Sequence, residues 1–291
     1  PSDPGDVLRL GRFAIALSRY SGLWSGLRLV ADVADAGRIV DLEELQSEIV
    51  LPELERASGA PRPRIDTLLL PPNVLRIEQD LVFLRIEAVH RFARANDLNP
   101  ITSRHARDRV GLLAAGALYR ELESALALLG LDEPERARLG LRLQKIDLVW
   151  PLEVERIREF ASGLEAIAVV DSRRGGLEEQ VRAALYDGGT RARVLGSHDE
   201  RGAPWLARRH EISGGTLAQD LAPWLASRLG EPALTARIAP LEAAIARAAS
   251  GAEPLSRPAG PPRREEGGGG GATGGLLSAP LAAGWSAPLA A

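Results

Sequence analysis

The 291-residue sequence contains no cysteine and no methionine. Without cysteine the chain cannot form a disulfide, a thiolate metal site or an iron–sulfur ligand, and it has no thiol nucleophile. No apolar run approaches the roughly 20 residues that a membrane helix needs. The net charge of −3 provides no basic footprint for nucleic acid. We therefore expect neither nucleic acid nor a membrane as a partner.

Lysine is almost absent as well, because Lys145 is the single lysine among 36 basic residues. Arginines scattered among acids, with abundant Ala, Gly, Leu and Pro, are typical of a GC-rich genome rather than of a functional patch. The chain opens at Pro1 and shows no signal peptide, so we expect an interior or processed piece of a longer protein. The remaining composition, 45% hydrophobic and 26% charged, is typical of a soluble globular protein.

Residues 108–230 alternate short apolar runs with amphipathic segments, which predicts an α/β domain with a mainly parallel sheet and flanking helices. Pro151 is expected in the first turn of one helix, and Thr216 with Gln219 is expected to form a capping box at the start of the last. Strands are expected at 110–114, 141–149, 166–170 and 193–196, each followed by a helix.

The segments on either side of this domain carry weaker signals. Helices are predicted at 7–17 and 23–34, with a break near Gly22, and at 76–96. The stretch 36–75 is expected to be connecting structure with one short strand at most, around 65–70. An alanine-rich helix is expected at 231–250. Residues 251–291, with a glycine run and a repeated SAPLAA, are expected to be a disordered tail.

Side chains in a catalytic or metal-binding pattern are not evident, and we assign no catalytic, cofactor-binding or metal-ligating residue. The histidines lack ligand spacing and are expected to form ordinary hydrogen bonds. Acidic pairs such as Glu178-Glu179 are expected on solvated faces, because general acid–base catalysis needs a sheltered site. Core or interface packing is expected for four tryptophans: Trp24, Trp150, Trp205 and Trp224. The histidines are His90, His105, His198 and His210.

One loop is a weak candidate for an anion or interface contact. Arg173, Arg174, Gly175 and Gly176 lie between a predicted strand and a predicted helix. In an open parallel sheet ligands bind beyond the carboxyl ends of the strands, and helix N-termini favour anions. The alternative is a solvated loop that needs small residues, because adjacent arginines are common in an arginine-rich chain.

Several stretches together resemble one family over about residues 7–230. They read ALSRYSGLWSGLR at 16–28, FARAN at 92–96, GLLAAG at 111–116 and LRLQKIDLVWPLE at 141–153. The order and spacing of these stretches are similar to those in the large bacterial indolepyruvate ferredoxin oxidoreductases. These enzymes are thiamine diphosphate-dependent 2-oxoacid:ferredoxin oxidoreductases. The resemblance identifies the predicted α/β domain at 108–230 as transketolase C-terminal-like.

The resemblance also implies how the rest of the chain is divided. Residues 1–46 would be the C-terminal remnant of a pyrimidine-type thiamine-binding domain, and 47–107 a connecting segment with one helix. Residues 231–250 would be a helix before the tail at 251–291. The cysteines that the family carries beyond this helix are missing here, and Leu23 and Gly175 replace a frequent cysteine and a frequent proline. A shifted reading frame in the tail is one hypothesis for this change.

The implied activity is the oxidative decarboxylation of indolepyruvate or another aryl pyruvate to an acyl-CoA in the full-length protein. The family uses thiamine diphosphate, Mg²⁺ and iron–sulfur clusters, none of which we expect in this chain. Expected partners are the missing domains of the same protein or a homodimer, with ferredoxin for the full-length enzyme in the cytoplasm. This chain alone is expected to be inactive. The alternative is a non-catalytic α/β binding or scaffold module.

Overall fold

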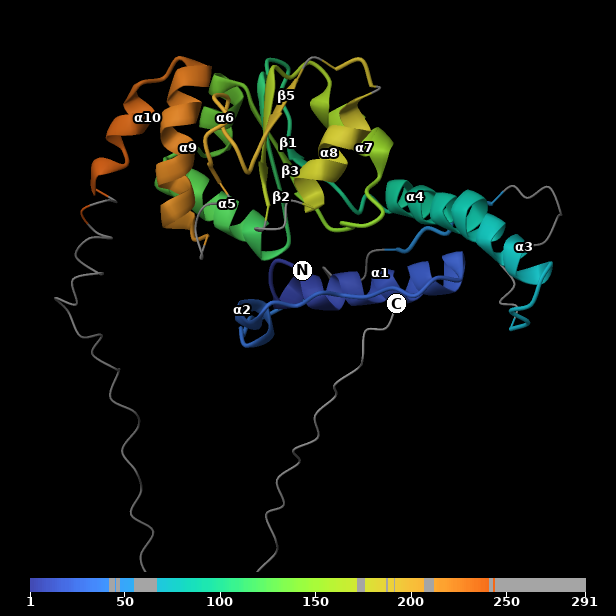
Figure 1. Cartoon of the computed structure of the whole chain (residues 1–291). Helices are drawn as coiled ribbons and strands as arrows, with labels where there is room; N and C mark the ends of the chain where they lie inside the picture. Colours follow the sequence, from blue (N-terminus) through green and yellow to red (C-terminus); the bar gives the residue numbers. More distant parts are fainter. Residues whose placement is uncertain are drawn as a thin grey trace, which may run out of the picture. The chain divides into compact units, whose positions relative to one another are not determined.

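A five-stranded sheet lies at the centre of the computed structural model shown in Figure 1. The structure describes residues 1–41, 45, 48–54, 67–171, 176–186, 188–190, 192–206, 212–240 and 243. Its strands are β1 (Ile101–Ser103), β2 (Val110–Ala115), β3 (Leu141–Ile146), β4 (Ala166–Val170) and β5 (Arg193–Leu195), in the order β1-β3-β2-β4-β5. Only β1, at one edge, runs antiparallel to its neighbour. The predicted α/β class with a mainly parallel sheet is confirmed.

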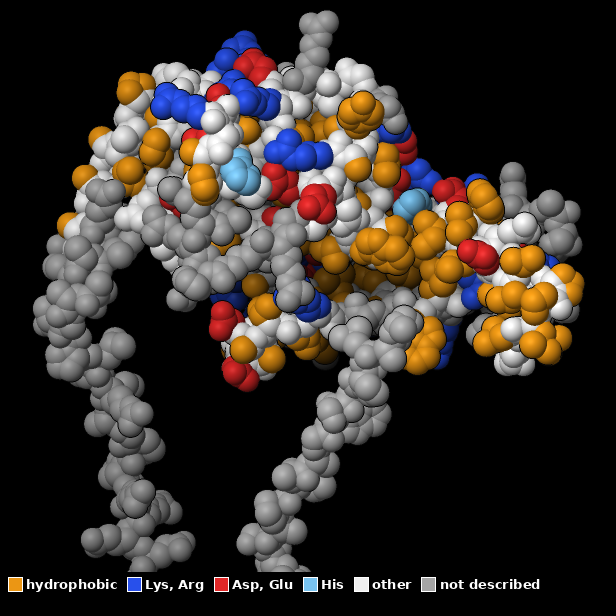
Figure 2. All heavy atoms as spheres, in the orientation of Figure 1, with side chains coloured by type: hydrophobic (Ala, Val, Ile, Leu, Met, Phe, Trp, Pro, Cys, Tyr) orange, Lys and Arg blue, Asp and Glu red, His pale blue; other side chains and the backbone are white. Residues whose placement is uncertain are grey.

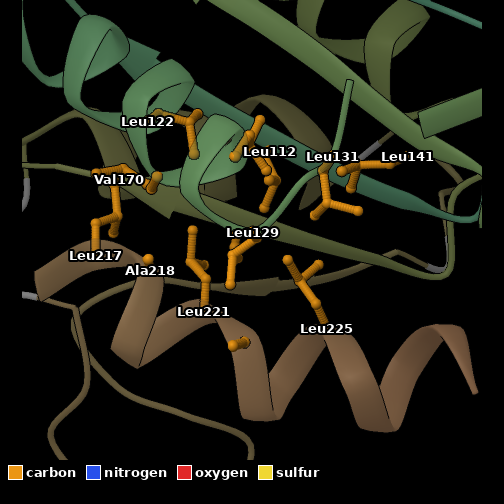
Figure 3. Packing of buried hydrophobic residues seen from close by; sticks show 14 of the residues in the cluster. Leu112, Leu122, Leu129, Leu131, Leu141, Val170, Leu217, Ala218, Leu221 and Leu225 are labelled. Carbon is orange, nitrogen blue, oxygen red and sulfur yellow. The ribbon is translucent and has the colours of Figure 1, made fainter. Parts of the chain in front are cut away.

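Helices cover both faces of the sheet (Figure 1). α5 (Ala117–Leu128) and α9 (Gly214–Leu229) lie on one face, and α7 (Val154–Ala161) and α8 (Gly176–Tyr186) lie on the other. Successive side chains of a strand point to opposite faces, so Leu112 joins the first core and Leu113 the second. Figure 3 shows Leu112 packed among leucines of α5 and α9. Two covered faces explain why β4 is entirely apolar and buried.

The glycine in β2 is required by packing on the α7 face. A Cβ at Gly111 would lie 2.6 Å from Cδ1 of Leu164 and 2.8 Å from Cζ of Phe160. Both of these side chains are buried in the core under α7 and α8. The absent side chain therefore lets the aromatic ring approach the sheet directly.

The helices that precede β1 among the described residues form a helical layer. α1 (Pro4–Ser21) ends at Gly22, whose φ of 71° lies in the left-handed region that favours glycine. α3 (Asn73–Asp80), the π-turn η2 (Leu81–Arg85) and α4 (Ile86–Ala95) follow one another without a break, which confirms the helix predicted at 76–96. Phe13 of α1 meets Phe92 of α4 edge to face, with ring centroids 6.4 Å apart.

The helix predicted at 23–34 is wrong for most of its length. Only α2 (Ala31–Ala34) is helical, and residues 22–30 form no helix or strand in the structure. Leu23, Leu27 and Val30 have helical spacing there, but Trp24 and Leu29, which lie between them, are apolar too. The spacing therefore could not separate a helix from an extended segment that is apolar on both faces.

Smaller corrections concern element boundaries. α7 begins at Val154 with Glu153 as its N-cap, so Pro151 precedes the helix. The capping box of α9 joins Ser213 and Thr216, so Thr216 is the third helical residue rather than the cap. α6 (Glu133–Leu139) and β1 were not predicted. Within 231–250 the structure gives α10 (Ala233–Ala236), and most of the remaining segment, like all of 251–291, lies outside the described residues.

The tryptophans divide into two groups. Trp205 and Trp224 pack with ring centroids 5.3 Å apart, as expected for core residues. Trp150 is 69% exposed and Trp24 is fully exposed, so neither packs in a core of the described chain. None of the helices among the described residues has both the length and the hydropathy that a membrane crossing requires.

Candidate functional site

The carboxyl ends of β2 and β4 define the natural ligand edge of this sheet. These strands are neighbours, but β2 leads to α5 on one face whereas β4 leads to α8 on the other. Open α/β sheets bind ligands at such a divergence of connections. The predicted loop at 173–176 follows β4 and therefore belongs to this edge.

Gly116 makes the turn between β2 and α5. Its φ of 54° and ψ of −134° form a combination that is accessible only to glycine. A Cβ at this position would also lie 3.2 Å from the carbonyl oxygen of Pro1. The turn is therefore closely covered by the start of the N-terminal helical layer.

The start of α8 is already capped by a side chain of the protein. Oδ2 of Asp171 accepts hydrogen bonds from the amides of Leu177 at 2.7 Å and Glu178 at 3.2 Å. Those two amides are consequently not open to an external anion. Gly176 is the first residue of α8, whereas Arg173, Arg174 and Gly175 lie outside the described residues. The anion or interface contact of this loop stays a prediction.

Glu178 is buried, which corrects the expectation of a solvated face. Its Oε2 accepts from the Ser197 amide at 2.7 Å, and its Oε1 accepts from Nη2 of Arg182 at 2.7 Å. Burial alone would raise the pKa of Glu178, but the bonds from Ser197 and Arg182 outweigh it and lower the pKa. Because a Cβ at Gly196 would come within 2.7 Å of Oε2, glycine there makes room for the carboxylate. Glu178 thus ties α8 to the end of β5.

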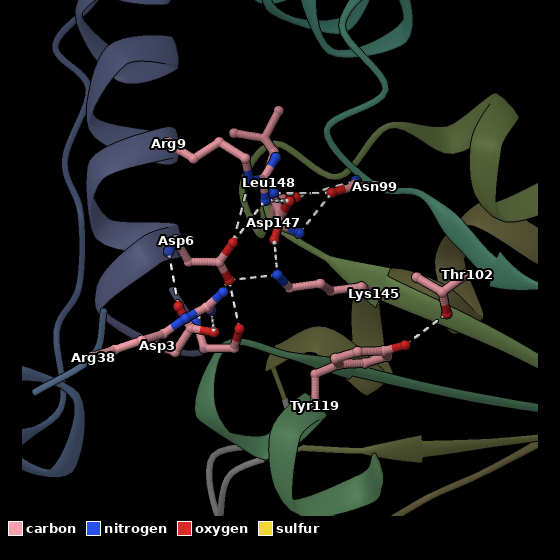
Figure 4. Close-up of polar contacts among 11 residues, drawn as sticks. Asp3, Asp6, Arg9, Arg38, Asn99, Thr102, Tyr119, Lys145, Asp147 and Leu148 are labelled. Carbon is pink, nitrogen blue, oxygen red and sulfur yellow. Dashed lines mark hydrogen bonds and ion pairs between the residues drawn. The ribbon is translucent and has the colours of Figure 1, made fainter. Parts of the chain in front are cut away.

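A second polar group lies at the carboxyl end of β3 and joins it to α1 (Figure 4). Nζ of Lys145 contacts Oδ2 of Asp6 and lies 3.5 Å from Oδ1 of Asp147. Nη2 of Arg9 contacts Oδ2 of Asp147 and lies 3.0 Å from Oδ1 of Asp6. The Lys145 cluster, defined as Asp6, Arg9, Lys145 and Asp147, therefore holds two cations between two carboxylates.

Because the charged groups of the Lys145 cluster are largely buried, each one is stabilised by its partners of opposite charge rather than by water. The side chain of Asp147 is 1% exposed, that of Asp6 is 9% exposed and that of Lys145 is 13% exposed. Burial would raise the pKa of Asp6, but hydrogen bonds from Lys145 and Ser2 hold that pKa well below its usual range. The pKa of Arg9 is raised, because the attraction of Asp147 and Asp6 exceeds the opposing effect of burial.

Asn99 shapes the turn that carries Asp147. Its Oδ1 accepts from the amides of Asp147 at 3.0 Å and Leu148 at 2.9 Å, and its Nδ2 donates to the Leu148 carbonyl at 3.3 Å. Gln144 in turn donates to the backbone carbonyl of Asn99 at 3.1 Å. Asn99, which precedes β1, therefore holds the turn after β3 that carries Asp147.

The Lys145 cluster acts as a clamp that holds α1 against the end of β3. Each carboxylate faces a cation, so no carboxylate of this cluster is poised as a general base, and the ion-paired ammonium is not a nucleophile. The two aspartates hold Lys145 and Arg9 where a metal ion would need their oxygens. Across the described residues, no three histidines, aspartates or glutamates converge on a metal position.

One cofactor that the resemblance implies, the iron–sulfur cluster, does not fit the residue types of this chain. Iron–sulfur clusters require cysteine, which the sequence does not contain.

The histidines lie apart from this edge or make local contacts. Nε2 of His105 lies 3.0 Å from Glu133, and Nδ1 of His198 lies 3.1 Å from Oγ of Ser197. His90 lies 4.0 Å from Glu87, and His210 is outside the described residues. No metal centre is built from the three described histidines.

Sequence reasoning did not assign the residues of the Lys145 cluster. Asp6 and Arg9 belong to α1, whereas Lys145 and Asp147 belong to the end of β3, and no local pattern links the two segments. The one available signal was that Lys145 is the single lysine of an arginine-rich chain.

Comparisons with known proteins agree with this architecture. The sequence profile of the indolepyruvate oxidoreductase domain matches residues 101–248, which is half of the chain and includes the whole sheet. The chain belongs to this family, and the resemblance seen in its sequence is confirmed.

Relatives with curated descriptions are considerably longer. Indolepyruvate oxidoreductase subunit IorA of Methanothermobacter marburgensis is 25% identical over 199 residues, covering 68% of this chain and 30% of that protein. The same subunit of Thermococcus kodakarensis is 26% identical over 196 residues, covering 67% of this chain and 29% of the relative. The chain therefore spans just under a third of the length of these relatives.

Two solved structures overlap the chain in part. One is 2-oxoglutarate:ferredoxin oxidoreductase from Magnetococcus marinus, with 13% identity and a TM-score of 0.36, covering 57% of this chain and 25% of that one. The other is a split-gene transketolase described as an inactive β4 tetramer, with 19% identity and a TM-score of 0.31, covering 45% and 41%.

Proposed function

We propose that the chain supplies the α/β domain of a 2-oxoacid:ferredoxin oxidoreductase and serves there to position neighbouring domains. Family membership over residues 101–248 supports the enzyme class. The Lys145 cluster supports the positioning role, because it fixes α1 on the carboxyl edge of the sheet with buried charges. This buried clamp is the observation that carries the proposal.

The division of the chain follows from the same proposal. Residues 1–46 end a pyrimidine-type thiamine-binding domain, 47–107 connect it, and 108–230 form the transketolase C-terminal-like domain. A helix at 231–250 follows it. The clamp then joins the first of these domains to the third, because Asp6 belongs to one and Lys145 to the other.

The proposed reaction of the whole protein is oxidative decarboxylation of indolepyruvate or another aryl pyruvate to an acyl-CoA, with ferredoxin as electron acceptor in the cytoplasm. Thiamine diphosphate, Mg²⁺ and iron–sulfur clusters would be held by polypeptide other than this chain. The relatives are described as subunits, which supports partner subunits or a homodimer for this protein.

A calorimetric titration tests whether this chain itself binds the cofactor. We expect the purified chain to give no binding heat with thiamine diphosphate and Mg²⁺, because the proposal assigns the metal diphosphate to polypeptide other than this chain. Tight stoichiometric binding would contradict the proposal.

A turnover assay tests the enzyme class. The assembly isolated from source cells should reduce ferredoxin with indolepyruvate and coenzyme A, whereas the purified chain should not. Turnover by the chain alone would contradict the positioning role. An assembly without 2-oxoacid oxidation would instead favour the binding or scaffold module.

A further inference from the structure

We propose that residues 24–29 form a β-strand of a second sheet, completed on both sides by strands from polypeptide outside this sequence. The inference goes beyond the proposed reaction, because such pairing does not depend on whether the assembly oxidises a 2-oxoacid. It rests on the backbone, the side chains and the surroundings of this segment.

The segment is extended along α1. Figure 1 shows the chain turning after α1 and running back beside it to α2. Eight extended residues, 23–30, span about 26 Å, and the 18 residues of α1 span about 27 Å. Near the end of the segment, Val30 has φ −90° and ψ 157°, which are strand values.

The backbone of the segment has no partner within the described chain. No hydrogen bond joins the amides or carbonyls of residues 24–29 to any other described residue. The neighbouring positions are anchored, because Leu23 accepts from Ser18 at 2.7 Å and Val30 accepts from the amides of Val33 and Ala34. Both edges of the segment are therefore open to strand pairing.

Three of the six residues in the segment have large, apolar and exposed side chains. Trp24 is fully exposed, Leu27 is 39% exposed and Leu29 is 44% exposed. Trp24 lies at an even position and Leu27 and Leu29 at odd positions, so an extended segment presents apolar side chains on both of its faces. Part of one face is already covered, because Cδ1 of Leu27 lies 4.0 Å from the Cβ position of Gly11 in α1.

Apolar side chains elsewhere in the helical layer are also exposed. Figure 2 shows hydrophobic side chains gathered over the end of the layer that holds α3. The exposed apolar residues there include Leu75, Val82 and Phe83. An exposed patch of this kind marks a surface that another protein segment covers.

Additional polypeptide of the family is the occupant that fits. The relatives are more than three times as long as the part that this chain matches, so they contain ample sequence for further strands. A second copy of this chain could pair with only one edge across a two-fold axis and would leave the other edge unsatisfied. The two open edges therefore favour strands from other parts of the protein.

Hydrogen–deuterium exchange tests the proposal directly. In the purified chain the amides of residues 24–29 should exchange within seconds, because no described residue accepts a hydrogen bond from them. In the assembly isolated from source cells they should exchange at least about 100-fold more slowly. Unchanged rapid exchange in the assembly would overturn the proposal. Protection already present in the purified chain, accompanied by dimerisation, would overturn it in favour of a second copy.

Proline variants provide an independent test. Leu27→Pro and Arg28→Pro each remove an amide donor, one from each edge, and proline is excluded from central strands. Each should reduce recovery of the chain in the assembly by about tenfold or more. Ile39→Pro is the control, because Ile39 is exposed outside any helix or strand and should assemble normally. Normal recovery of both test variants would contradict the proposal, and unchanged melting of the isolated variants excludes unfolding as the cause.

Discussion

Lys145 is the single lysine of an arginine-rich chain. Arginine supplies every other basic side chain, yet a lysine stands between Asp6 and Asp147. A compact ammonium with three donors fits between two carboxylates, whereas a planar guanidinium needs more room. Arg9 supplies the larger cation at the more open side, where its side chain is 27% exposed.

Replacing this ammonium should be costly. We expect Lys145→Met to lower the free energy of unfolding by on the order of 2–3 kcal/mol, because two buried carboxylates lose a charged partner. Lys145→Arg should lose less, since it keeps the charge. Urea denaturation measures both. Arg19→Met is the matched control, because Arg19 is exposed on α1 and should change stability by less than about 0.5 kcal/mol. A methionine variant as stable as the parent would contradict the clamp.

Glu178 should make stability depend on acid. Its pKa in the folded chain lies below the ordinary value of 4.5, so the carboxylate stabilises the fold above pH 4.5. That contribution is lost as the pH falls below 4.5 towards the folded pKa. We therefore expect Glu178→Gln to lower stability at pH 7 and to flatten its decline below pH 4.5. Urea titrations at pH 7, 5.5, 4 and 3 check this, and parallel curves for variant and parent would show that Glu178 is not responsible.

At the scale of elements, strands buried on both faces were the easiest to predict. β2 and β4 are short apolar runs bounded by turns, and their length of five or six residues favours a buried strand over a helix, which needs about ten or more. β1 could not be predicted, because three residues have no period and their pairing with β3 depends on the fold. Residues 23–34 were predicted as helix because Leu23, Leu27, Val30 and Ala34 have helical spacing, which an extended segment with apolar residues on both faces can share.

The same limit applies to the candidate site. The loop after β4 could be placed at the carboxyl edge from strand order alone, but the cap that Asp171 provides to α8 could not. The Lys145 cluster joins α1 to the end of β3 across 139 positions of sequence, so its composition depends on tertiary packing.

Packing between α7 and β2 gives a sharp test of the fold. Gly111→Ala should lower the free energy of unfolding by about 1–3 kcal/mol, because the new Cβ would meet Leu164 and Phe160 well inside van der Waals distance. Gly37→Ala is the control, since a Cβ there meets nothing within 4 Å. Guanidinium denaturation of the two variants compares them, and equal midpoints would be inconsistent with Phe160 lying against β2.

At the scale of the whole molecule, the chain combines a covered parallel sheet with a helical layer held at its carboxyl edge. Family membership covers the sheet, and the relatives extend well beyond the matched region. Buried ion pairs contribute more to specificity of arrangement than to net stability in some proteins. Here they would set the orientation of α1 relative to the sheet, and with it the orientation of residues 24–29.

A double-mutant cycle between Asp6 and Lys145 tests this central claim most directly. Free energies of unfolding are measured for the parent, Asp6→Asn, Lys145→Met and the double variant. The clamp predicts a coupling energy of about 1–3 kcal/mol, because each single variant removes the same interaction between α1 and β3. Additive effects of the two substitutions would contradict a direct contact and with it the placement of α1 on the carboxyl edge of the sheet.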